Sequence, residues 1–174
     1  MLSRKSPGFG IGQRGVGMIE VLVAVLVVAV GVIGYAGMQL YALRGAENAG
    51  HRTHATLIAR DGLERIMANP AATNNYLTPA NWPNGPLQPG TPYPMGCVNV
   101  ACTPNQLSVA DIAQLSWAAA NSLPLGRVMA SFDCTGVPSP SCVVVSWQGT
   151  EPAECLVGNQ INTTDPCVVM EALR

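Results

Sequence analysis

Charged residues are scarce in this chain, and the scarcity is uneven. Only 11% of the 174 residues are Asp, Glu, Lys or Arg. Beyond Pro70 the only basic residues are Arg127 and Arg174, against six acidic ones. A nucleic-acid-binding surface needs clustered Lys and Arg, so we do not expect this part of the chain to bind nucleic acid.

Histidine is absent after His54, which removes the commonest general base from most of the chain. The sequence also lacks Gly-x-Ser-x-Gly, His-Glu-x-x-His and a phosphate-binding P-loop. We therefore expect a protein that is not an enzyme and has no cofactor and no small-molecule substrate. His51 and His54 lie three residues apart on a predicted helix without a third ligand in view, so no metal site is predicted.

Cysteine is absent from the first 96 residues, and six cysteines follow within one small region. An even number confined to a small domain indicates disulfides in an oxidising compartment. Six cysteines allow 15 pairings; sequential pairing is favoured because each bond then closes a short loop. A zinc site is disfavoured, since the region lacks Cys-x-x-Cys and histidine. The candidates are Cys97, Cys102, Cys134, Cys142, Cys155 and Cys167.

Charge is also absent from residues 21–43, a run long enough to cross a bilayer as a helix. Glu20 stands at its start, and a carboxylate in a membrane segment is costly enough to suggest a function. Three basic residues precede the run, which predicts that this end stays in the cytoplasm and that the rest faces the periplasm. The run is longer than the apolar core of a cleaved secretory signal and has no Ala-x-Ala-like site.

The segment Gly15-Val16-Gly17-Met18-Ile19-Glu20, with its basic leader and apolar run, resembles the class III signal of type IV prepilins and type II secretion pseudopilins. The resemblance implies cleavage after Gly15 by a prepilin peptidase and methylation of the new terminus at Val16. It also implies that Glu20 pairs with the terminal ammonium of a neighbouring subunit during assembly. Val16 stands where the family usually has Phe or Met.

The helix is predicted to continue to Ala68, because no proline interrupts the chain before Asn69-Pro70. Its outer half has an apolar stripe at helical spacing, which predicts a face that packs on a domain. The stripe consists of Ala55, Ala59, Leu63 and Ile66, with Ile58 and Met67 beside it.

The remaining residues predict a small α+β domain. Residues 71–95 are rich in Pro, Asn and Gly and are expected to form a loop. A helix is expected at 109–121, capped by Ser108 and Asp111, and strands at 127–133, 142–147 and 167–172. Three antiparallel strands against the long helix would give a pilin-like fold.

The order of several weak motifs resembles minor pilins of the PilV class: residues 61–69, Asp111-Ile112 ahead of Trp117, residues 123–126 and residues 144–147. The resemblance implies a methylated minor pilin that primes pilus assembly at or near the tip. Its partners would be other minor and major pilins, the prepilin peptidase and the inner membrane, before transfer to the cell surface.

Two other functions stay open: a type II secretion minor pseudopilin, and a membrane-anchored periplasmic binding domain that does not polymerise. Four segments are expected: a leader at 1–15, a membrane half-helix at 16–43, an amphipathic half-helix at 44–69 and a disulfide-braced domain at 70–174.

Overall fold

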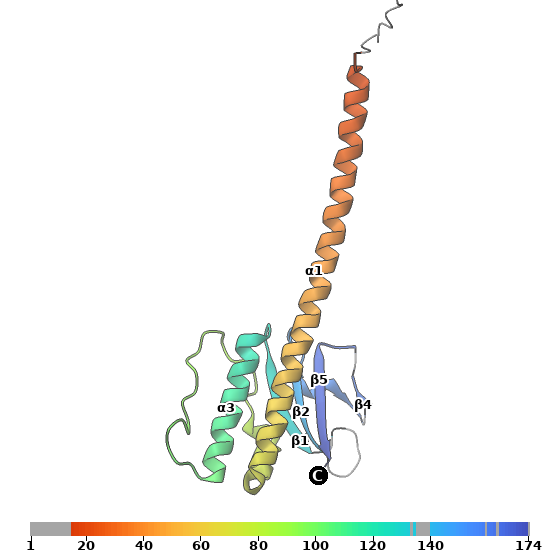
Figure 1. The fold of residues 1–174 in the computed structure, drawn as a ribbon. Coiled ribbons are helices and arrows are strands. Elements are labelled where there is room, and N and C mark those ends of the chain that lie inside the picture. Colours follow the sequence, from red (N-terminus) through yellow and green to blue (C-terminus); the bar gives the residue numbers. More distant parts are fainter. Residues whose placement is uncertain (1–14, 133, 135–139, 159, 163, 174) are drawn as a thin grey trace, which may run out of the picture. The chain divides into compact units, whose positions relative to one another are not determined.

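A computed structural model describes residues 15–132, 134, 140–158, 160–162 and 164–173. The chain divides into two compact units, Met1–Gly45 and Ala46–Arg174, and each is considered by itself. The fold is α+β, with a long amino-terminal helix and a small antiparallel sheet, as the sequence predicts (Figure 1).

Helix α1 runs from Met18 to Ala68 without interruption, the range predicted from the sequence. It ends where Pro70 prevents a further helical turn. The backbone N–H of Asn69 still reaches the carbonyl oxygens of Arg65 at 3.2 Å and Ile66 at 3.3 Å. The helix therefore closes with a tightened last turn directly before the proline.

The sheet of the second unit has three antiparallel strands in the order β1-β2-β5. Their bounds are Arg127–Phe132, Pro140–Ser146 and Cys167–Leu173. In the register Ala130 lies opposite Val143, and Val145 lies opposite Val168. All three strands were predicted. A two-stranded hairpin of β3 (Leu156–Val157) and β4 (Gln160–Ile161) was not predicted.

The second half of α1 covers one face of this sheet. The predicted stripe is buried on that face, except that Met67 is 60% exposed. Gly62 brings the helix close to β2, because a Cβ added there would lie 3.2 Å from a methyl group of Val143. Alternate residues of β2, Val143 and Val145, join this core. The apolar stripe that the sequence predicts is thus the face of α1 that packs on the sheet.

The opposite face of the sheet packs against two disulfides. Val144 of β2 lies with the disulfides Cys134–Cys142 and Cys155–Cys167 in a second, smaller core. A third disulfide joins Cys97 to Cys102. The six cysteines are therefore paired in sequence order, which is the arrangement that the sequence favoured. Both faces of a small sheet are covered, although only one has a helix against it.

The expectation that residues 71–95 form a loop was wrong in part. Residues 71–95 are not entirely loop, because short helices occupy Pro70–Ala72, Thr73–Tyr76 (α2) and Pro79–Asn81. Pro70 and Pro79 stand at the first position of their helices, where a missing N–H costs nothing. The segment is anchored by buried aromatic side chains rather than solvated, since Tyr76 is fully buried and Trp82 is 3% exposed.

Helix α3 runs from Pro104 to Ser122 and so begins more than one turn before the predicted start. Its capping box is formed by Thr103 and Gln106, not by Ser108 and Asp111. Pro104 occupies the first helical position, which fixes the helix start one residue after Thr103. Ser108 and Asp111 lie within the helix and are buried.

Candidate functional site

The residues predicted to serve processing and assembly lie in the first unit. Gly15, Val16 and Gly17 precede α1, and Glu20 lies in its first turn, with its N–H bonded to the carbonyl of Gly17 at 2.9 Å. All four residues are exposed. Within the described residues no side chain pairs with the Glu20 carboxylate. The candidate cysteines belong to the second unit.

The apolar surface that follows Glu20 is continuous. Every large apolar side chain from Val16 to Leu43 is more than half exposed. Soluble monomers rarely expose a contiguous patch of this kind. Among the described residues one helix, Met18–Ala68, is long and apolar enough to cross a membrane, and its most apolar window is entirely unburied. This surface needs lipid or other helices to cover it.

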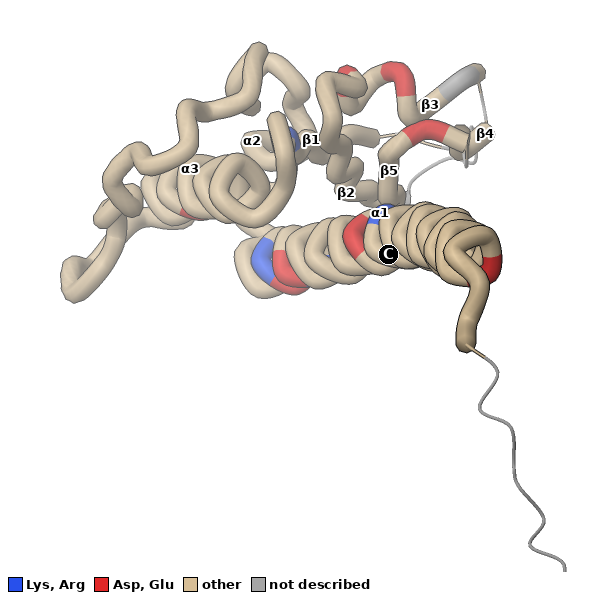
Figure 2. The backbone as a smooth tube through the Cα atoms, turned by 90° about the horizontal axis from the view of Figure 1, so that it is seen from above, with Lys and Arg blue, Asp and Glu red and all other residues tan. Residues whose placement is uncertain are grey.

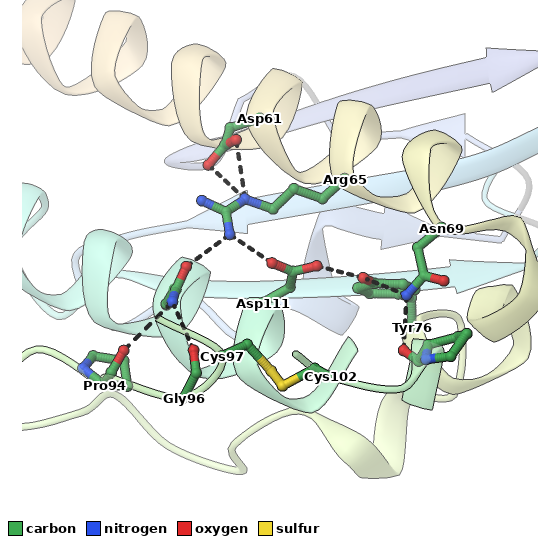
Figure 3. Close-up of polar contacts among 11 residues, drawn as sticks. Asp61, Arg65, Asn69, Tyr76, Pro94, Gly96, Cys97, Cys102 and Asp111 are labelled. Atoms are coloured by element: carbon green, nitrogen blue, oxygen red, sulfur yellow. Dashed lines mark hydrogen bonds and ion pairs between the residues drawn. A yellow bond between two sulfur atoms is a disulfide. The ribbon is translucent and has the colours of Figure 1, made fainter. Parts of the chain in front are cut away.

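A polar network holds the second unit together around Arg65 (Figure 3). The Arg65 Nε donates to both carboxylate oxygens of Asp61, at 3.0 and 3.1 Å, one turn earlier on α1. Its Nη1 donates to Asp111 at 2.7 Å and to Gln114 at 2.9 Å, both on α3. Burial lowers the pKa of Arg65, but hydrogen bonds to Asp61 and Asp111 outweigh it, so the net pKa is raised.

Asp111 also receives a hydrogen bond from α2. Its second carboxylate oxygen accepts from the hydroxyl of Tyr76 at 2.5 Å. Burial, followed by this hydrogen bond, raises the pKa of Tyr76 above the ordinary tyrosine value of 10.0. Asn69 donates to the same hydroxyl at 3.3 Å and to the carbonyl of Pro104 at 2.8 Å. The ends of α1 and α3 are thus joined through α2.

Gln114 extends the network to the loop that carries the first disulfide. Its amide nitrogen lies 3.4 Å from the carbonyl oxygen of Pro94 and 3.5 Å from that of Gly96 (Figure 3). Gly96 directly precedes Cys97. The network contains one cation, two carboxylates and neutral donors, and its contacts join α1, α2 and α3, so its geometry suits a structural clamp.

Charge elsewhere is dispersed. Figure 2 shows few charged positions among the described residues, and on α1 basic and acidic positions lie next to each other. Within the described residues no group of three metal-ligating side chains comes together. The predicted helix face with His51 and His54 is half-buried at the first histidine and exposed at the second.

Sequence reasoning missed the network because it assigned Asp111 to a helix cap. The available signal was that Asp111 sits among the apolar positions Ala110, Ile112 and Leu115, where a carboxylate needs a cation. Arg65 was a candidate for this cation. It follows Asp61 at the i, i+4 spacing that is typical of ion pairs on a helix. The contact across 46 residues depends on tertiary packing.

Comparison with known proteins gives one finding. A family model described as Tt1218-like, type IV pilin Tt1218, matches residues 37–113. The match begins within α1 and ends within α3, which is less than half of the chain. It supports a relationship to type IV pilins. No curated protein and no solved structure matches the chain.

Proposed function

We propose that this chain is a minor pilin of a type IV pilus, of the PilV class, with a structural role and no catalytic one. The observation that carries the proposal is the joint occurrence of two features. A pilin-family match covers the outer half of α1 and its continuation into α3. Ahead of it lies an exposed apolar helix with a single carboxylate in its first turn.

The apolar surface suits two successive environments. In a precursor it would lie in the inner membrane, with the amino terminus in the cytoplasm and the second unit in the periplasm. In a filament it would pack against the same surface of other pilins. The three disulfides fit an oxidising exterior, because such bonds persist outside the cytosol. Incorporation only at or near the pilus tip would explain why such a subunit is present in few copies.

Processing is the first step of this proposal. A prepilin peptidase would cut after Gly15 and leave Val16 as a methylated amino terminus. Gly15 is exposed, and a Cβ added at Gly15 would meet nothing within 4 Å in the fold. A Gly15→Ala variant should therefore fold like the wild type, so that any effect on maturation reflects peptidase recognition.

The test is to express the full chain in its own host and measure the intact mass. We expect the wild type to begin at methylated Val16 and to co-purify with sheared pili. We expect Gly15→Ala to keep its leader and to stay in the membrane fraction. An intact Met1 terminus in wild-type protein, despite an active peptidase, would instead support a non-polymerising membrane-anchored domain.

The same experiment separates a pilin from a type II secretion pseudopilin. A processed protein that is absent from sheared pili, in a strain whose deletion loses protein secretion but keeps twitching, would contradict the pilus assignment. Loss of twitching on deletion, restored by wild type and not by Gly15→Ala, is the result that we expect.

A further inference from the structure

The second unit has a polar pocket on its surface. The pocket lies next to the part of α1 with which this unit begins. It has a volume of about 260 Å³ and is lined by Asn48, Arg52, Trp147, Gln148, Thr164 and Pro166. We call it the Arg52 pocket. The Arg52 guanidinium carbon lies 5.7 Å from the centre of the Trp147 ring, within the range of a cation–π contact. Trp147 is 2% exposed, whereas Arg52 is exposed.

The wall of the pocket is fixed by the backbone. The Trp147 N–H donates to the carbonyl of Pro166 at 3.1 Å, and the Gln148 N–H donates to the carbonyl of Pro124 at 2.7 Å. Gln148 adopts a left-handed conformation with φ 57°, followed by Gly149 with φ 88°. The buried indole thus forms a surface over which the exposed arginine side chain lies.

The donors in the pocket are available. Arg52 makes no ion pair with any described residue. Asn48 and Gln148, both exposed, also line the pocket and bring their side-chain amides to it. The Thr164 hydroxyl and N–H are already used, since both donate to Asn162. The Asp165 carboxylate, next in sequence, accepts from Asn162 and does not line the pocket. The pocket thus offers one cation and two amides, which suit an oxyanion.

The position of these donors in the sequence narrows the choice of anion. Asn48 follows Leu43, the last residue of the apolar run, by five residues, and Arg52 follows it by nine. Nine helical residues rise only about 13 Å. Residues 44–54 hold Arg44 and Arg52 against a single acid, Glu47, whereas the chain beyond Pro70 is acidic. A guanidinium binds phosphate oxygens well, and phospholipid headgroups lie at the end of a membrane span.

From this pocket and its place in the chain, we propose that the Arg52 pocket binds the phosphate of an anionic phospholipid headgroup. The guanidinium on Trp147 supplies the charge, and the amides of Asn48 and Gln148 supply hydrogen bonds. The inference rests on the membrane anchoring in the proposed function and not on filament assembly. A lipid held there would keep the second unit at the bilayer surface before assembly.

The test uses the full-length chain purified in a mild nonionic detergent. Phosphatidylglycerol is titrated into it, and bound lipid is counted by native mass spectrometry. We expect one tightly held phosphatidylglycerol in the wild type, and about fivefold weaker binding in Arg52→Gln, the loss that one basic residue near a lipid surface predicts. Phosphatidylcholine, which has the phosphate without the net charge, should bind more weakly to the wild type.

Arg60→Gln is the matched control, because Arg60 is also an exposed arginine of α1 but pairs with Glu64 outside the pocket. It should bind lipid like the wild type. Equal binding by both variants would overturn the proposal, and so would displacement of the lipid by millimolar inorganic phosphate, which would indicate a free-anion site.

Normal lipid binding by Arg52→Gln, combined with its loss from pili, would overturn the proposal in favour of an acidic side chain on another subunit. The lipid assay needs neither peptidase nor pilus. A failure of the pilus assignment would therefore leave its result interpretable.

Discussion

At the scale of single residues, burial decides which ion pair matters. Arg60–Glu64 and Arg65–Asp61 both have i, i+4 spacing on α1, and this spacing can be recognised in the sequence. Only Arg65 also reaches Asp111, whose side chain is 9% exposed. An exposed pair contributes little because water screens it. Loss of the partner of a buried carboxylate is costly, because the charge stays behind in the protein.

Tyr76 gives this network a pH dependence. Its pKa in the folded protein is raised above the unfolded value of 10.0, so the folded state holds the phenolic proton more tightly. The hydroxyl therefore contributes its full stability below pH 10, and the contribution is lost as the pH rises above 10. We expect the midpoint of the unfolding transition of the full chain in detergent to be lower at pH 11 than at pH 9.

The control for this prediction is Tyr76→Phe, which removes the hydroxyl and leaves the ring. At pH 8 the variant should be less stable by about 1–2 kcal/mol, since Asp111 loses a hydrogen bond. Its midpoint should then change less than that of the wild type from pH 9 to pH 11. Identical slopes for both proteins would show that other groups cause the alkaline loss.

At the scale of elements, long periodic segments could be predicted and short ones could not. The range of α1 followed from an unbroken helical pattern closed by Pro70, and β1, β2 and β5 followed from alternation and valine content. The two-residue strands β3 and β4 have no pattern long enough to read. The helices at residues 70–81 form because Tyr76 and Trp82 are buried there, which is a tertiary effect.

The same distinction holds for the candidate site. The leader, Glu20 and the cysteines were recognisable because each is a local motif or a rare residue. The clamp of Arg65, Asp111 and Tyr76 was not, because it joins α1, α2 and α3. Asp111 three residues after Ser108 satisfied a capping pattern, while the actual cap, Thr103, stood before a proline.

The turn from α3 to β1 depends on Gly126. Its N–H donates to the carbonyl of Leu123 at 3.1 Å, and an added Cβ would overlap the backbone of Ala119, lying 2.7 Å from its carbonyl carbon. Gly126→Ala must therefore move the end of α3 away from the strand. We expect a loss of about 2–3 kcal/mol in unfolding free energy.

This loss is measured by denaturant unfolding with tryptophan fluorescence, because all three tryptophans lie in the second unit. Gly85→Ala is the matched variant, since a Cβ at Gly85 meets nothing within 4 Å. It should change the unfolding free energy by no more than about 0.5 kcal/mol. Equal stability of the two variants would contradict the close approach at Gly126.

At the scale of the whole molecule, the two units meet opposite requirements. The second unit has its own core, a buried polar clamp and three disulfides, so it needs no partner to cover its sheet. Among the described residues of the first unit, no large apolar side chain is buried. The chain therefore combines a self-sufficient domain with a helix that needs lipid or neighbouring subunits around it.

Glu20 is the residue through which this difference is expected to control assembly. It is the single charged residue between Met18 and Leu43. A carboxylate surrounded by hydrocarbon needs a cation, and in the proposed filament the amino-terminal ammonium of a neighbouring Val16 supplies it. The pair would fix the axial position of each subunit more than it stabilises the filament, because both charges lose water when they meet.

A Glu20→Val variant should consequently stay in the membrane and be processed, yet enter pili at least about tenfold less than the wild type, since it leaves the neighbouring ammonium unpaired. The amount is measured as the ratio of this subunit to the major pilin in sheared fibres. Glu47→Gln is the control, because it removes an exposed acid of α1 beyond the apolar run. Should the two variants enter pili equally, axial registration would have to come from the second unit, and the carboxylate at the start of the span would need another explanation.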